Sequence, residues 1–264
     1  LGDVYKRQVL HEACHGVAAL LVGGQWHAFN LFAVDWGPET LADGRKLIIE
    51  ASPALLNILI GLLAVFLFGR LWARRRPMGG LFLMYTAGYS LLMGFGYLLV
   101  DPLFYQPGGE NLGDWKKVID MLGGSWAMRL PLLLVGVAGV LWTFFWLGRA
   151  GLRFARDATD KVERRRVALP LLLVPYLVIN VLFTVLSIWH PLGAEGVFVV
   201  AFQYWFGYSG FFWAFFLAGY WLEVKAPLAD VRTLPQRVSW PWVIVSGCAL
   251  LSAIVILVPT LWLG

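Results

Sequence analysis

The sequence has little charge for its length. Asp, Glu, Lys and Arg make up 14% of the 264 residues, against about 25% in ordinary soluble domains. Hydrophobic residues, by contrast, make up 59%. So small a charged fraction beside so large an apolar one excludes a disordered chain and a nucleic-acid-binding tail protein.

Cysteine is also scarce. The chain has two, Cys14 and Cys248, and both lie inside apolar runs. They form neither a CxxC pair nor a disulfide framework, which excludes a small secreted domain held together by disulfides. Their placement leaves the redox compartment of the protein open.

Long apolar runs are what the sequence has in abundance. A helix that crosses the bilayer core needs about 20 apolar residues. The runs that approach or reach this length are residues 9–24, 52–72, 79–100, 130–147, 167–189, 197–222 and 240–263. We therefore expect an all-α fold, a polytopic transmembrane helical bundle of about seven spans, in a prokaryotic cell membrane.

Basic residues gather in alternate connections between these runs. The connections 74–76, 149–166 and 225–237 are rich in Lys and Arg, whereas 25–51 and 101–129 hold fewer basic residues relative to acidic ones. Cytoplasmic loops of membrane proteins are enriched in Lys and Arg, so the basic connections are expected in the cytoplasm. The net charge of +5 then reflects topology and contact with lipid headgroups, with no nucleic-acid partner.

Two segments outside the apolar runs, residues 1–8 and 25–51, lead to separate predictions. Residues 1–8, LGDVYKRQ, resemble the in-frame translation of a sequencing adapter, so we expect native sequence to begin at Val9. Within residues 25–51, the β-prone runs AFNLFAV and RKLIIEA flank the turn-like GPETLADG. This arrangement predicts a small β-hairpin in that connection.

The first apolar run contains His11, Glu12 and His15 in the pattern HExxH. Residues i and i+4 share one face of a helix, so both imidazoles can hold one cation while Glu12 lies near enough to activate water. Ionisable groups inside a bilayer are costly and are candidates for function. The cluster predicts a catalytic metal site with Glu12 as general base. The alternative is a pair of structural histidines in an apolar helix.

The sequence around this cluster resembles a known family. VLHEACHGVAALLVGG resembles the first core helix of the site-2 protease class of intramembrane zinc metalloproteases. SPALLN, residues 52–57, is similar to the family's Gly-Pro-x-x-Asn segment, with one additional residue between Pro53 and Asn57. The resemblance covers roughly residues 9–125, a metalloprotease-like core, and leaves 126–264 as additional transmembrane helices.

The resemblance also implies the ligands of one catalytic Zn²⁺. NLGDW, near residue 114, resembles the family's Asp-bearing segment, although the usual Asp-Gly pair is inverted here. By that likeness His11, His15 and Asp114 would bind the metal. Asp101, in LLVDP, is the rival third ligand, and His27 is a further candidate. His/carboxylate sites accept several divalent metals, so the pattern alone does not exclude iron or cobalt.

Other polar residues have simpler interpretations. Asp114 is well suited to cap the short helix predicted after it. Asn57 would bind a substrate backbone, or form an interhelical hydrogen bond as expected for Asn180 and Gln203. His190, before a proline, is expected in a loop.

The resemblance implies a membrane-embedded zinc metalloprotease that cleaves transmembrane protein substrates within or near the bilayer. The alternative is a non-proteolytic scaffold or metal-binding regulatory protein that retains the fold. A metal transporter is disfavoured, because the later spans offer few ionisable residues for a conduction path. The family generally opens its site toward the cytoplasm, whereas the charge pattern places Asp114 outside, so both orientations stay open, as do the substrate and the oligomeric state.

Overall fold

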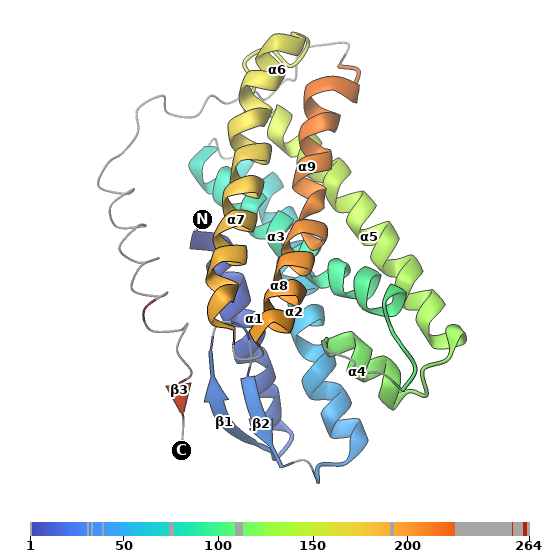
Figure 1. The fold of residues 1–264 in the computed structure, drawn as a ribbon. Helices are drawn as coiled ribbons and strands as arrows, with labels where there is room; N and C mark the ends of the chain where they lie inside the picture. The colour runs from blue at the N-terminus through green and yellow to red at the C-terminus, as the bar shows by residue number, and fades with distance from the viewer. Residues whose placement is uncertain are drawn as a thin grey trace.

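The computed structural model is mostly helical, with a small sheet at one end (Figure 1). It describes residues 2–30, 32, 34–38, 40–73, 77–108, 113–190, 193–224, 255 and 261–262. The elements in chain order are α1 (Gly2–Leu21), β1 (Gln25–Phe29), β2 (Val34–Gly37), α2 (Asp43–Ala73), α3 (Pro77–Leu103), α4 (Asp114–Met121), α5 (Trp126–Leu152), α6 (Lys161–Ala168), η1 (Leu169–Leu173), α7 (Val174–Leu186), η2 (Ser187–Trp189), α8 (Gly193–Gly207), α9 (Ser209–Phe216), η3 (Leu217–Trp221) and β3 (Leu261–Trp262).

Four of the described helices are long and apolar enough to cross a membrane, and they indicate a membrane protein. They are Asp43–Leu71, Pro77–Leu103, Trp126–Leu152 and Lys161–Trp189. The apolar part of α1, Val9–Leu21, is shorter. The expected number of about seven spans is not confirmed. Segment 197–222 is divided at Tyr208 into α8 and α9, and segment 240–263 lies almost wholly outside the described residues.

The expected hairpin exists, but its second strand was placed wrongly. β1 pairs antiparallel with β2, so the chain turns back after Phe29, well before GPETLADG. The run RKLIIEA belongs to α2, which begins at Asp43 with an acidic first turn that suits a helix N-terminus. Ile49 and Ala51 of that run are buried. The segment beginning at Ser52 therefore lies inside α2 and does not open it.

The sheet packs against the helix that carries the HExxH pattern. Its strand order is β2-β1-β3 within the described residues, with both pairings antiparallel. Trp26 of β1 lies directly on α1, where a Cβ at Gly16 would come within 2.2 Å of the indole ring. Only glycine fits at this position, so Gly16 fixes the sheet beside the end of the pattern.

Helices α2, α3 and α5 pack closely through glycines. A Cβ at Gly94 of α3 would lie 2.7 Å from the Ala54 carbonyl oxygen of α2. A Cβ at Gly136 of α5 would lie 2.4 Å from the Leu99 nitrogen of α3. Small residues let helix backbones approach in this way, as is common where helices associate in membranes. Helix α3 is consequently held between two neighbours and is largely buried.

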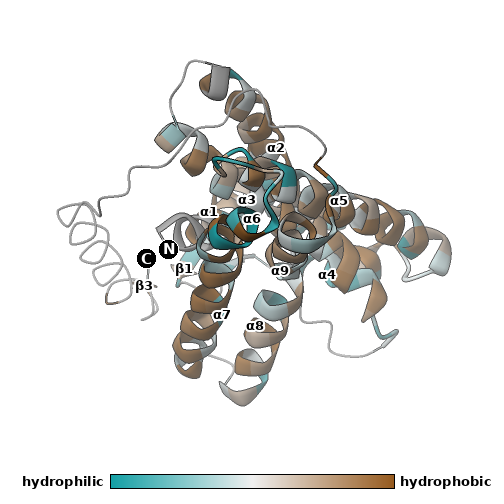
Figure 2. Ribbon diagram, turned by 90° about the horizontal axis from the view of Figure 1, so that it is seen from above, coloured by the Kyte–Doolittle hydropathy of each residue, from teal (hydrophilic) through white to brown (hydrophobic). Residues whose placement is uncertain are grey.

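The continuous run of helix from α6 to η2 extends from the end of the molecule opposite the sheet to the level where the sheet begins (Figure 1). Its turn widens to a π-helix at η1, where Pro170 lacks the N–H that a regular turn needs. Seen from above, the polar α6 caps the apolar α7 (Figure 2). The basic α6 therefore lies at one end of the molecule, and the sheet and α4 lie toward the other (Figure 1).

Candidate metal centre

Helix α1 supplies the first three residues of the site. His11 and His15 are 1% and 3% exposed, one helical turn apart, and their rings meet edge to face. Glu12, between them in sequence, is also buried. Three ionisable side chains thus lie together inside the fold, where an ionised group without a partner would be costly.

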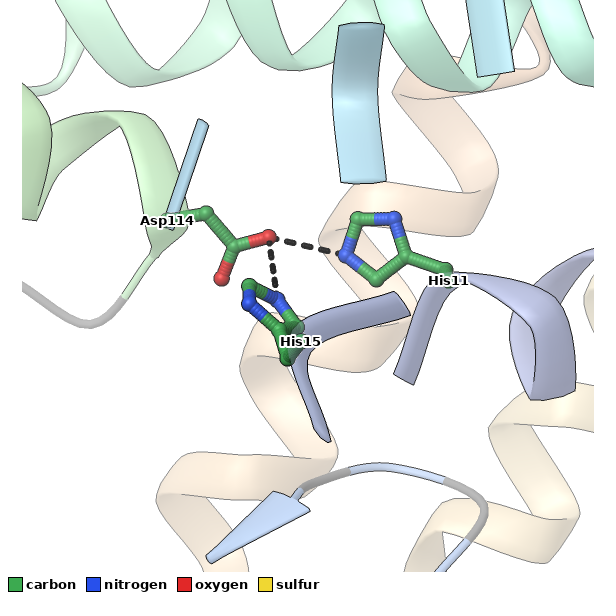
Figure 3. A group of neighbouring side chains, drawn as sticks. All are labelled: His11, His15 and Asp114. Carbon is green, nitrogen blue, oxygen red and sulfur yellow. Dashed lines mark hydrogen bonds and ion pairs between the residues drawn. The ribbon is translucent and has the colours of Figure 1, made fainter. Parts of the chain in front are cut away.

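Asp114, the first residue of α4, points toward both histidines of α1 (Figure 3). Its Oδ2 lies 2.8 Å from His11 Nε2 and 3.1 Å from His15 Nε2. Burial alone would raise the pKa of Asp114, but the neighbouring imidazoles of His15 and His11 outweigh it and hold the pKa well below its usual range. Asp114 is therefore an ionised carboxylate placed between the two rings.

Apolar packing places Asp114 at this point. Helix α4 is short and amphipathic, and Trp115 and Val118 on its apolar face are buried. They pack between α2 and α3 in a small cluster with Ala51, Ala54 and Leu98. Burial of these side chains fixes α4 against the bundle, and its first residue then lies over the histidines.

Asp101, the rival third ligand, has a different task. Its Oδ2 accepts a hydrogen bond from the Trp115 backbone N–H at 2.9 Å, so it caps α4 from α3. Gly113, before the helix, has φ +145°, and a Cβ there would lie 3.0 Å from Asp101 Oδ2. Asp101 is not among the residues whose ligand atoms converge. Nor is Asp114 the N-cap, because Gly113 occupies that position and Asp114 is the first helical residue.

The outer nitrogens of both imidazoles also have partners. His15 Nδ1 donates to the Ile49 carbonyl oxygen at 3.0 Å, so when the ring is neutral its lone pair is on Nε2, the nitrogen that faces Asp114. His11 Nδ1 lies 3.3 Å from Asn57 Nδ2, and its ring stacks on Tyr97 with centroids 4.9 Å apart. Asn57 therefore orients a candidate ligand, and a half-turn of its amide would present an oxygen to a protonated Nδ1.

A second carboxylate lies behind His15. Glu50 of α2 is 3% exposed, and its Oε2 is 4.0 Å from His15 Nδ1. Its Oε1 accepts from Lys117 Nζ at 2.9 Å. Burial would lower the pKa of Lys117, but the carboxylates of Glu50 and Asp114 outweigh it and raise the pKa above its usual value. Lys117 is consequently a permanent cation at the site.

This donor set fits a divalent cation. The ligand atoms of His11, His15 and Asp114 all lie within 4.8 Å of one another. Tetrahedral ligands at 2.0–2.1 Å from a zinc ion are about 3.3 Å apart, close to the separations of Asp114 from each ring. When Glu12, Glu50 and Asp114 are all ionised, their charges and that of the Lys117 ammonium sum to two negative charges, which a divalent ion would neutralise. The set suits several divalent metals, zinc among them.

The site opens onto a cavity of about 460 Å³. Glu12, His15 and Asp114 form one wall, and β2 contributes Val34 and Trp36. The opposite wall comes from α8, from the half of the chain in which the sequence shows no motif. Its lining residues include Gly196, Val200, Gln203, Tyr204 and Gly207. Both halves of the chain thus contribute residues to the cavity wall.

The remaining polar candidates lie apart from the converging group. The ring of His27 in β1 packs over Gly37, and His27 is not a member of the group. Asn180 donates to the Tyr176 carbonyl oxygen within its own helix, so the expected interhelical bond is wrong there. Gln203 does bond between helices, to Tyr97. His190 is in a connection, as expected, and also lines the cavity.

Sequence reasoning missed several residues that surround the site. Tyr97, Glu50 and Lys117 were not singled out. Lys117 carried a usable signal, because a residue three positions after Asp114 shares its helix face. Glu50 carried a weaker one, as an acid directly before an apolar run. Tyr97 carried none, since it is one aromatic among many.

The chain was also compared with known proteins. No protein-family model, no curated protein and no solved structure matches it.

Proposed function

We propose that the chain is a multi-pass, membrane-embedded zinc metalloprotease that hydrolyses peptide bonds of membrane-protein substrates within or near the bilayer. The observation that carries the proposal is the convergence of His11, His15 and Asp114 beside the buried Glu12, at the wall of a cavity (Figure 3). Two imidazoles and a carboxylate leave a fourth tetrahedral position open, as catalytic zinc sites do. We propose one zinc ion per chain.

Each protein group then has a defined role in the reaction. A bound zinc ion would supply Lewis acidity, which polarises a carbonyl and acidifies a water molecule. Glu12 would accept the proton of the attacking water and then give it to the leaving amine. The Ile49 carbonyl and Asn57 would keep His15 and His11 in position.

The sheet suggests how a substrate is held. β2 is an outer strand of the sheet formed by the described residues, and its Val34 and Trp36 line the cavity. A transmembrane helix must unwind locally before a protease can attack its backbone. We propose that the unwound segment adds to β2 as a further strand, since main-chain pairing with an open strand edge is a common mode of peptide binding.

The test is Glu12→Gln in the full chain, reconstituted in lipid vesicles with a single-span substrate. We expect cleavage to fall by about 10²–10⁴-fold, the usual contribution of a general base, while the zinc content is unchanged. The matched control is Glu195→Gln, an exposed residue in the first turn of α8. Unchanged cleavage in the Glu12 variant would refute the mechanism. Stoichiometric zinc without cleavage by the unmodified protein would favour the non-proteolytic, metal-binding alternative.

A further inference from the structure

Lys117 and Glu50 form an ion pair, buried at its Glu50 end, that the proposed reaction has not used. Lys117 Nζ donates to Glu50 Oε1 at 2.9 Å, and both residues line the cavity. The two side chains differ in access, because that of Glu50 is 4% exposed and that of Lys117 is 50% exposed. The pair therefore joins a buried carboxylate to a half-exposed lysine side chain at the cavity wall.

The pair is incompletely satisfied, which a purely structural salt bridge would avoid. Glu50 Oε2 is buried and has no hydrogen-bond partner within the described part of the chain. An ammonium has three N–H donors, and Glu50 accepts from Lys117 at one oxygen. Burying charges in this way is expensive, and unsatisfied buried groups often mark functional sites.

The position of Lys117 relates it to the reacting groups. It follows Asp114 by three residues in α4, so the two share a helix face. Its charge acts on Glu50, Asp114 and Glu12. Lys116, the other cationic residue lining the described cavity, lies beside Asp101 instead. Lys117 is thus the lysine whose charge acts on the carboxylates of the site.

We propose that Lys117 is a further catalytic residue, which donates a hydrogen bond to the scissile carbonyl oxygen as negative charge develops on it. Glu50 is the positioning residue that holds the ammonium over the cavity. The inference deepens the proposed function and rests on it. A preorganised donor at a developing oxyanion is among the largest contributions to enzymatic rates.

The step balances without another reactant. The water oxygen forms a bond to the carbonyl carbon, its proton passes to Glu12, and the carbonyl π-electron pair moves onto the oxygen facing Lys117. That pair then re-forms the C=O bond as the C–N bond breaks, and Glu12 returns the proton to the amine nitrogen. Lys117 donates a hydrogen bond throughout and stays protonated.

A merely structural role predicts different results. The Lys117–Glu50 pair also joins α4 to α2, so its loss could displace Asp114 and reduce metal binding. A catalytic role would instead lower kcat with the metal retained. If Lys117 donates to the oxyanion, its removal should weaken the binding of an anionic tetrahedral ligand more than the binding of a neutral peptide. If the Lys117–Glu50 pair is only structural, its removal should affect the two affinities equally.

The experiment compares Lys117→Met with the control Lys161→Met, an exposed lysine at the start of α6, in the full chain in zinc-loaded vesicles. Three quantities are measured: zinc content, kcat and KM on a single-span substrate, and the affinities for a peptidyl phosphinate and for its neutral peptide counterpart. We expect Lys117→Met to keep its zinc, to lose about 10²–10³-fold in kcat with KM within about threefold, and to lose its preference for the phosphinate. Lys117→Arg should restore part of both, and Lys161→Met should resemble the unmodified protein.

Each other result counts against the proposal. A kcat for Lys117→Met within threefold of the unmodified value would overturn it. So would a loss of cleavage that parallels a loss of zinc, because the pair would then be structural. If the unmodified protein cleaves nothing, the proposed function fails by itself. The phosphinate preference then decides separately whether Lys117 is an anion donor: a preference lost in Lys117→Met supports the donor, and an equal preference refutes it.

Discussion

Buried polar side chains behave differently in the two halves of the chain. In the half up to α4 they bond across the fold. His11 bonds to Asp114 103 residues away, Asn57 to His11 46 residues away, and Lys117 to Glu50 67 residues away. In α5 and α7 they bond to backbone carbonyls instead. Thr143 donates to the Gly139 carbonyl and Asn180 to the Tyr176 carbonyl, each four residues back in its own helix, while Arg129 donates to the Pro102 carbonyl of α3.

This contrast in hydrogen-bond partners indicates that polar residues occur inside apolar helices for two different reasons. A hydroxyl or amide group that donates to the preceding turn needs no other element for that hydrogen bond. A residue whose partner lies on another element needs the whole fold, and its cost must be justified by what the assembled group does. By this criterion the first half holds the residues of the proposed metal site, and α8 of the second half contributes residues to the cavity wall.

The largest expected effect is loss of the metal from α1. His15→Ala should reduce bound zinc to background, because it removes one of three proposed ligands. Asn180→Ala, an equally buried polar residue of the second half, should keep zinc at the unmodified level. Metal content by mass spectrometry of purified protein measures both. Equal zinc in the two variants would remove the distinction between the halves.

The next effect separates the two aspartates. Asp114→Asn should weaken zinc binding by more than about 100-fold, beyond the 10–100-fold range of residues that only support a ligand. Asp101→Asn can still accept from the Trp115 N–H, so its loss should be smaller and should show mainly as lower stability, by about 1 kcal/mol. Competition with a zinc chelator measures the affinities. The reverse order of effects would make Asp101 the ligand.

A smaller effect is expected from Asn57. Asn57→Ala removes the partner of His11 Nδ1 and leaves all three proposed ligands, so zinc affinity should fall by about 10–100-fold. The same chelator competition measures it, with Asn180→Ala as the control. An unchanged affinity would show that stacking on Tyr97 alone fixes the His11 ring.

The smallest effect tests the contact between the halves. Gln203 of α8 bonds to Tyr97, which stacks on His11. Gln203→Leu should lower stability by about 0.5–1.5 kcal/mol, the usual value of one hydrogen bond, and leave zinc affinity within about threefold. Thermal unfolding in detergent, with and without zinc, measures both. A large loss of zinc affinity would instead place α8 within the metal site.

The site was more predictable than the fold around it. His11, Glu12 and His15 are conspicuous because ionisable residues are rare in apolar runs. The preference for Asp114 over Asp101 rested on a resemblance, and the structure separates them by how α4 packs between α2 and α3. No local sequence pattern predicts that packing, because it depends on contacts among α2, α3 and α4, which are separate in the chain.

Helix ends were less predictable for a different reason. Hydropathy marks the apolar part of a helix, whereas the helix itself continues through polar turns. Helix α2 therefore begins at Asp43, well before Ser52, and the run mistaken for a strand is its first turns. Helix rotation was equally hidden, so the face of α3 that brings Tyr97 onto His11 could not be foreseen.

The close contact between Gly113 and Asp101 constrains how this segment can change. Exchanging the two neighbouring residues, by Gly113→Asp together with Asp114→Gly, would put a carboxylate-bearing carbon against Asp101 and force a φ that side chains disfavour. The exchange would therefore require a simultaneous change at residue 101. Residues 101, 113 and 114 must therefore change together. A redesign or a library that varies them one at a time would yield mostly variants in which this segment no longer fits against α3.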